Sequence, residues 1–386
     1  MKTLKKTLKY LVATLVLLVA ALYLTNTDYL IKAVRTTYMN GHTTAYLKDY
    51  KEFDNQPISP SSKPILWPNH KNYNSVEPTK KLNDLHNKTG SIAFVIIKND
   101  SIWYENYYDE FNESSKSNSF SMAKSYTSGL MQKAIQDGYI KSLDQPICDF
   151  LPQFCEGLAA KTTVGDLSSM SSGTNWDEAY YSPLSITTRA YFDDNLTKVI
   201  NGLEVVEEPG QKFKYASGDT QMLAMVIEKA SGKKMYDYLE ECFWKPLGAE
   251  HEAFWQVDSD HNDLVKAYCC IASNAKDFAR YGKLFKDHGK WGEHQILDSS
   301  FVVKSVKPRF SNSPEYGYGW WLASAANKDV FYMRGHLGQY VIVSPKDNVI
   351  IVRLGHRIAK STDADPHSSD FYTIVEEAFK MLDGKS

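Results

Sequence analysis

Strand-forming runs at two distant places in the chain, with a long helical stretch between them, constrain the fold most. The first two runs, 91–98 and 101–107, flank Asn99-Asp100, a dipeptide that favours a hairpin turn. Strand patterns return only late, over 316–323, 330–334, 339–343 and 349–354. Helical spacing of apolar residues occurs at about 78–86, 122–137, 220–230 and 371–382. This order predicts an α+β fold: an antiparallel sheet flanked by helices, with an all-helical domain inserted over about 121–255.

The first 27 residues have the pattern of an export segment. Four lysines within residues 1–9 precede an uncharged, apolar run over 10–27. Val19-Ala20-Ala21 has the small residues of a cleavage site, but Leu22-Tyr23-Leu24 continue the apolar run and favour a retained signal-anchor helix. The lysines place residues 1–9 as a cytoplasmic tail, with the rest of the chain outside the inner membrane, in the periplasm. If the segment is cleaved instead, the protein is secreted or periplasmic.

The rest of the chain divides into two parts. Residues 28–75 are polar and contain several prolines, so we expect a tether that packs partly on the main domain, residues 76–386. The chain has 44 Lys and Arg against 46 Asp and Glu, which leaves no basic excess for binding nucleic acid.

Five cysteines are too few for a disulfide-dense scaffold. Cys148 and Cys155 lie seven residues apart and are candidates for a disulfide outside the cytoplasm; the alternative is two buried thiols. The cysteines do not have C-x-x-C spacing, so we expect no zinc or redox motif.

A candidate nucleophile comes from the pattern S-x-x-K, which occurs at Ser121, Ser231 and Ser273. Ser231 precedes a glycine at a predicted helix end, and Ser273 precedes a helical pattern that it is suited to cap. Ser121 differs because it follows a polar loop and opens a long helix, whose positive end favours developing negative charge.

Lys124 lies one turn after Ser121, so their side chains share one face of the helix. A serine hydroxyl needs an adjacent base, and a lysine serves as one only if burial or a second cation disfavours its charge. The alternative for this pair is a simple helix cap beside a solvated lysine.

Two further motifs give the pair a context. Tyr215 lies on a turn before the helix near residue 220, and Arg334-Gly-His336-Leu-Gly338 precedes a strand. A serine with a lysine, then a tyrosine turn, then a glycine-containing strand edge resembles the serine β-lactamase and penicillin-recognising superfamily. The likeness is greatest to class C β-lactamase-related esterases and amidases, including the 6-aminohexanoate-dimer hydrolases, and covers about residues 76–386.

The resemblance implies a serine hydrolase mechanism. Ser121 attacks the substrate carbonyl and is acylated, and Lys124 takes its proton directly or through Tyr215. Tyr215, with its pKa lowered by the nearby ammonium, relays the proton to the leaving group and later activates water. The backbone N–H groups of Ser121 and Gln339 form the oxyanion hole.

The resemblance also implies substrate-binding positions: Ser217, His336, Gly338 and Tyr180. Tyr180 is either a substrate contact or an aromatic residue at the rim, and His336 either contacts substrate or supports its strand. Relatives that hydrolyse penicillin carry Lys-Thr-Gly where this chain has His336-Leu-Gly338, which argues against efficient β-lactam hydrolysis.

The sequence therefore predicts an exported or membrane-anchored serine hydrolase that cleaves an ester or amide bond of a small molecule or short peptide. Two alternatives remain open: a non-catalytic binding or sensor domain, and a D-amino-acid peptidase acting on cell-wall peptides. We expect no metal and no organic cofactor, because the proposed base and nucleophile are both side chains.

Overall fold

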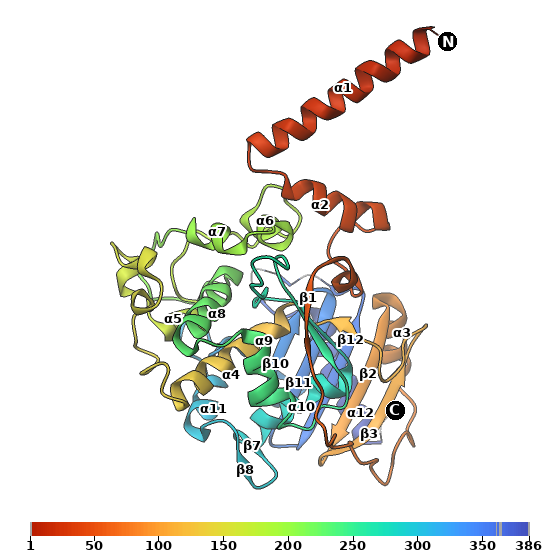
Figure 1. The fold of residues 1–386 in the computed structure, drawn as a ribbon. Helices are drawn as coiled ribbons and strands as arrows, with labels where there is room; N and C mark the ends of the chain where they lie inside the picture. Colours follow the sequence, from red (N-terminus) through yellow and green to blue (C-terminus); the bar gives the residue numbers. More distant parts are fainter. Residues whose placement is uncertain (1, 360, 363–364, 385–386) are drawn as a thin grey trace.

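A six-stranded antiparallel sheet forms the centre of the computed structural model, which describes residues 2–359, 361–362 and 365–384 (Figure 1). The strands lie in the order β3-β2-β12-β11-β10-β9. Their bounds are β2 Ser91–Lys98, β3 Ser101–Tyr107, β9 Trp321–Ala325, β10 Lys328–Gly335, β11 Gln339–Ser344 and β12 Val349–Gly355. β2 pairs with β12, so strands from the two distant parts of the chain lie side by side. The predicted α+β fold class is confirmed.

One predicted strand, 316–323, begins later than expected. Residues before Trp321 fold back instead, because Gly317 N–H donates to the Trp320 carbonyl at 3.0 Å and Gly319 has φ +78°. Only β9, from Trp321 onward, joins the sheet.

The sheet is covered on both faces, and its strands show this in their alternation. In β2, Phe94 and Ile96 belong to one apolar cluster, while Val95 and Ile97 belong to another. The first cluster includes residues of α3 (Lys80–Thr89) and α12 (Ser369–Leu382). The second includes residues of α4 (Ala123–Gln136) and α10 (Ala275–Lys286). The four predicted helices are present as α3, α4, α8 and α12, with ends within a few residues of the expected bounds.

Helices follow one another through the middle of the chain. Besides α4 they are α5 Val164–Ser168, α6 Ile186–Phe192, α7 Leu196–Asn201, α8 Ser217–Ser231 and α9 Met235–Leu239, with α11 Ser299–Ser305 later. Helices α4 and α8 pack together, and α5 packs on α8. That this segment is an inserted domain stays a prediction.

A second, four-stranded sheet connects the N-terminal segment to the start of α4. Its order is β1-β5-β6-β4, with bounds β1 Asn55–Ile58, β4 Ser117–Asn118, β5 Ala253–Gln256 and β6 Ile271–Ser273; β7 (Lys290–Trp291) and β8 (His294–Gln295) form a small hairpin. Leu47 and Ile58 are buried in the main core. Part of residues 28–75 therefore packs on the domain, and that the segment as a whole is a tether stays a prediction.

The N-terminal helices lie at one end of the molecule. Helix α1 (Lys2–Leu24) extends away from the body, and Thr3–Leu24 is long and apolar enough to cross a membrane (Figure 1). Helix α2 (Tyr29–Thr36) follows and packs against α6. The Tyr29 hydroxyl donates to the Pro183 carbonyl at 3.0 Å, which helps to hold α2 in place.

The structure contains two disulfides. Cys148 and Cys155 are bonded, as the sequence suggested, and Cys242 is a buried free thiol. Cys269 and Cys270, which are adjacent, are also bonded; nothing in the sequence analysis anticipated this pair.

Candidate active site

Ser121 lies in a tight turn that leads into α4. A 3₁₀ turn, Phe120–Met122, precedes the helix, and Phe120 has φ +46°, a left-handed conformation that is uncommon for a bulky residue. The Asn118 side chain accepts a hydrogen bond from Phe120 N–H at 2.9 Å, and Ser119 N–H donates to the Ile271 carbonyl at 2.7 Å. These contacts hold an unfavourable backbone conformation, as is typical of functional turns.

Strand β10 ends directly against this turn. A Cβ atom at Gly335 would lie 2.1 Å from the Ser119 carbonyl oxygen, so only glycine allows the strand to come this close. This approach brings the segment after Gly335, with His336, beside Ser121.

Lys124 is buried and points at the nucleophile. Its Nζ lies 2.9 Å from Ser121 Oγ and donates to the Tyr268 carbonyl at 2.7 Å. Burial lowers the pKa of the ammonium to about 8, and the nearby Glu178 carboxylate acts in the opposite direction. At neutral pH a useful fraction of Lys124 is therefore the free amine that can accept a proton.

Tyr215 faces the same pair. The Lys124 Nζ lies 5.0 Å from the centre of the Tyr215 ring. Burial and the Glu178 carboxylate raise the pKa of Tyr215, whereas a hydrogen bond with Ser121 and the charge of Arg334 act to lower it. The expectation of a lowered pKa was wrong, because burial outweighs the nearby cations.

Glu178 is the residue that the sequence analysis missed. It accepts four hydrogen bonds: from Trp176 Nε1 at 2.6 Å, from the Tyr180 hydroxyl at 2.6 Å, and from the Ser217 hydroxyl and N–H at 2.5 and 3.0 Å. Nothing in Trp176-Asp-Glu-Ala-Tyr180 distinguishes this carboxylate from a surface one, because its donors come from two separate segments of the chain.

His336 and Tyr180 stack face to face next to the nucleophile. Their ring centroids are 5.3 Å apart, and Phe120 packs edge-on against His336 at 5.5 Å. Burial lowers the pKa of His336 to about 4, so the imidazole is neutral at physiological pH. Its Nε2 atom is buried and has no hydrogen-bond partner among the described residues, so it can interact with a polar group of a ligand.

Gln339 and Gly338 lie behind these residues. The Gln339 side chain is buried and bonds to Gly355 through both of its polar atoms, at 2.7 and 3.0 Å. The Gly338 carbonyl accepts a hydrogen bond from the buried Arg353 guanidinium at 2.9 Å. A Cβ atom at Gly338 would lie 2.5 Å from Arg353, so the structure explains this glycine by packing; its contact with substrate stays a prediction.

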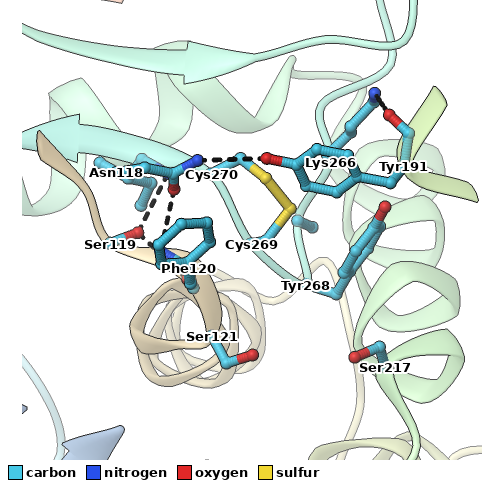
Figure 2. The surroundings of a disulfide bond; sticks show 12 residues. Asn118, Ser119, Phe120, Ser121, Tyr191, Ser217, Lys266, Tyr268, Cys269 and Cys270 are labelled. Atoms are coloured by element: carbon cyan, nitrogen blue, oxygen red, sulfur yellow. Dashed lines mark hydrogen bonds between the residues drawn. A yellow bond between two sulfur atoms is a disulfide. The ribbon is translucent and has the colours of Figure 1, made fainter. Parts of the chain in front are cut away.

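The Cys269–Cys270 disulfide lies close to Phe120, Tyr268 and Ser121 (Figure 2). The two cysteines separate Tyr268, whose carbonyl holds Lys124, from Ile271, whose carbonyl holds Ser119. The bonded pair therefore lies between the residue that holds Lys124 and the residue that holds the turn before Ser121.

Two cavities border Ser121. One has a volume of about 320 Å³ and extends toward α2 and α6. The other, of about 400 Å³, contains Tyr215, Glu178 and Arg334. Tyr180 and His336 line both cavities, so these two side chains and Ser121 mark their junction. In the ranges that the structure describes, no cluster of His, Cys, Asp and Glu suited to a metal ion occurs.

Comparison with known proteins identifies the family of this chain. Residues 79–368 match the family described as Beta-lactamase. The chain belongs to the beta-lactamase family. Members of this family are serine hydrolases, with amidases, esterases and β-lactamases among them, so this beta-lactamase-family chain is a hydrolase of that kind.

Relatives of this beta-lactamase-family chain are distant in sequence. The 6-aminohexanoate-dimer hydrolase of Paenarthrobacter ureafaciens is 23% identical in an alignment of 289 residues that covers 69% of this chain and 73% of that protein. The structure of the octameric penicillin-binding protein homologue from Pyrococcus abyssi has a TM-score of 0.63 at 17% identity, covering 79% of this chain and 76% of that one. A D-stereospecific amidohydrolase from Streptomyces sp. has a TM-score of 0.60 at 15% identity, covering 79% and 98%. The structural likenesses show the fold.

Proposed function

We propose that this protein is a membrane-anchored serine hydrolase that cleaves an ester or amide bond through an acyl-enzyme on Ser121. The observation that carries the proposal is the buried Lys124 amine, 2.9 Å from Ser121 Oγ, with its pKa lowered to about 8. A purely binding protein has no need of a buried lysine beside a serine, because burying the charge is unfavourable.

Acylation begins when Ser121 Oγ attacks the substrate carbonyl and its proton passes to the neutral Lys124 amine. The negative charge that develops on the carbonyl oxygen is stabilised by the N–H groups of Ser121 and Gln339, each typically worth about 3–4 kcal/mol. The C–O or C–N bond then breaks, and the leaving group takes a proton.

Tyr215 is suited to give that proton. Its raised pKa keeps the phenol protonated at neutral pH, so it acts as a donor to the leaving group and is reprotonated from the Lys124 ammonium. In deacylation, a water molecule gives its proton to Lys124 and attacks the acyl-enzyme. Ser121 Oγ then leaves and takes the proton back from the Lys124 ammonium, which releases the acid and restores the free enzyme. One water is consumed for each bond cleaved.

The substrate is a small molecule or short peptide with a linear ester or amide bond. His336-Leu337-Gly338 replaces the Lys-Thr-Gly of penicillin-hydrolysing relatives, so the cation that holds a β-lactam carboxylate is lacking at this position. The names of the relatives, a 6-aminohexanoate-dimer hydrolase and a D-stereospecific amidohydrolase, favour amide or ester substrates over β-lactams.

Helix α1 supports the proposed location in the membrane. Its length and composition suit a single membrane span, and the lysines before it favour a cytoplasmic N-terminus with the catalytic domain in the periplasm.

A fluorophosphonate probe tests the mechanism. With full-length protein in detergent, we expect one adduct, located on Ser121 by peptide mass spectrometry, and labelling at least tenfold slower in Lys124→Ala and Tyr215→Phe. Ser231 and Ser273, which share the S-x-x-K pattern, serve as internal controls and stay unlabelled. A folded protein that is not labelled, or that is labelled equally fast without Lys124, would overturn the proposal.

A further inference from the structure

The two cavities that meet at Ser121 differ in chemical character. The larger one, of about 400 Å³, contains the charged residues Glu178 and Arg334 together with aromatic rings, among them Trp321. The smaller one, of about 320 Å³, is lined by apolar, hydroxyl and aromatic residues and His336; no Asp, Glu, Lys or Arg of the described chain lines it. Because burial keeps His336 neutral, the lining of the smaller cavity carries no net charge at physiological pH.

The uncharged cavity is large enough for a ligand group. Its volume lies at the lower end of the range of about 300–1,000 Å³ that is typical of small-molecule sites. Phe120, Tyr268 and Cys269 line this cavity. Figure 2 shows these three residues near Ser121. An aliphatic chain attached to the carbonyl that Ser121 attacks fits this environment.

Helix α2 forms the opposite wall of this cavity. Leu30, Ala33 and Val34 line it, and they belong to the helix that follows the membrane-spanning α1 after a few residues. Val34 is 49% exposed, so one side chain both faces the cavity and reaches the outer surface. The cavity therefore borders the end of the domain from which α1 extends (Figure 1).

Arg334 provides a polar counterpart on the other side of Ser121. It donates to the Pro366 carbonyl at 2.5 Å and lies over the Trp321 ring at 5.1 Å; in the described part of the chain it forms no ion pair with a carboxylate. A half-buried cation with no carboxylate partner among the described residues favours an anionic or strongly polar ligand group.

We propose that the substrate is a membrane amphiphile: its acyl chain enters the uncharged cavity past α2, and its polar leaving group lies in the cavity with Arg334. This inference rests on the proposed serine hydrolase function and names its substrate class. The ester or amide is hydrolysed with one water to a fatty acid and the free alcohol or amine.

A series of fluorogenic esters tests the acyl cavity. Full-length protein in nanodiscs is assayed with 4-methylumbelliferyl acetate, butyrate, octanoate and dodecanoate. Each methylene that becomes fully buried is worth about fourfold in binding, so we expect kcat/KM to rise by at least tenfold from acetate to octanoate. A flat series or a preference for acetate would overturn the proposal.

The variant Val34→Asp places a charge at the cavity wall, and Ile31→Asp is its matched control. Ile31 is on the same helix and 38% exposed, close to the 49% of Val34, but it does not line this cavity. We expect the ratio of kcat/KM for dodecanoate over acetate to fall at least tenfold in Val34→Asp and to stay at the wild-type value in Ile31→Asp. Equal ratios in both variants would overturn the proposal.

A further assay tests whether the enzyme takes its substrate from the bilayer in which it is embedded. 4-Methylumbelliferyl palmitate is loaded either into nanodiscs that hold the protein or into empty discs mixed with protein-bearing discs. We expect at least tenfold faster hydrolysis in the first case, and equal rates would exclude the bilayer as the source. Fluorophosphonate labelling of Ser121 is measured in every sample: if labelling fails, the hydrolase proposal is wrong, whereas labelling without chain-length preference rejects only the amphiphile.

Discussion

At the scale of single residues, Glu178 has the widest influence on the chemistry around Ser121. Its carboxylate raises the pKa values of Tyr215, Tyr180 and Tyr268, and it opposes the effect of burial on Lys124. All of these groups lie in or beside the two cavities. Glu178 therefore adds to the effect of burial on the tyrosines and limits how readily Lys124 loses its proton.

Replacing Glu178 by Gln is expected to move the pH profile of catalysis. Only the neutral form of Lys124 accepts the Ser121 proton, so kcat/KM of the wild type rises with pH through a midpoint near the Lys124 pKa of about 8. The carboxylate stabilises the ammonium and raises this pKa, so its removal moves the midpoint to lower pH. The measurement is kcat/KM for a fluorogenic ester between pH 5 and 10.

The control for this variant is Glu156→Gln, a substitution of the same kind at an exposed position away from the site. We expect the wild-type midpoint there. Glu178→Gln also replaces an oxygen that accepts two of the four hydrogen bonds by an NH2 group that cannot accept, and we expect this to destabilise the fold by about 1–3 kcal/mol in chemical denaturation. A midpoint that stays in place or moves to higher pH would contradict the assigned role.

At the scale of elements, the site depends on how the end of β10 meets the turn before α4. The Phe120 backbone is left-handed, and the contacts that hold it come from β4, β6 and β10, which are far apart in the chain. The Cys269–Cys270 pair precedes β6. It lies between Tyr268 and Ile271, whose carbonyls accept hydrogen bonds from Lys124 and Ser119. The nucleophile turn is thus positioned by neighbouring strands rather than by its own sequence.

Gly335→Ala tests this contact. The added Cβ would lie 2.1 Å from the Ser119 carbonyl oxygen, which is backbone and cannot move freely, so β10 or the turn must shift. We expect a loss of about 1–3 kcal/mol in unfolding free energy, together with a fall in kcat that exceeds any change in KM.

Gly202→Ala is the matched control. A Cβ there would have its nearest neighbour, the Val199 carbonyl, at 3.4 Å, an ordinary contact distance. Both stability and kcat should stay close to wild type in this variant. If Gly335→Ala behaves in the same way, the close approach of β10 is not what positions Ser121.

At the scale of the whole molecule, the N-terminal segment is part of the architecture. β1 pairs with β5, α2 packs on α6, and α2 lines the uncharged cavity. Cleavage after α1 would leave these contacts in place but would remove the proposed membrane span next to α2. The proposed access of a membrane substrate therefore depends on retention of α1.

We expect α1 to be retained. When the full chain is produced in bacterial cells, the protein should stay with membranes after a carbonate wash, and mass spectrometry should recover peptides from residues 10–27. The physical reason is that Leu22-Tyr23-Leu24 continue the apolar run beyond the candidate cleavage site at Ala20-Ala21. A soluble periplasmic protein that begins near residue 22 would contradict this prediction.

The sequence was enough to predict β2, β11 and β12, because a strand covered on both faces is a nearly continuous apolar run, which is a local pattern. It also placed Ser121 and Lys124 on one helical face, since their spacing follows from helix geometry alone. The order of the motifs then led to the family.

Only the tertiary structure decided the environment of these groups. The raised pKa of Tyr215, the four donors of Glu178 and the wall formed by α2 all depend on burial and on contacts between segments far apart in the chain. Desolvation and charge interactions act through space, so they become defined only when the packed chain sets which groups are neighbours and how much water remains between them.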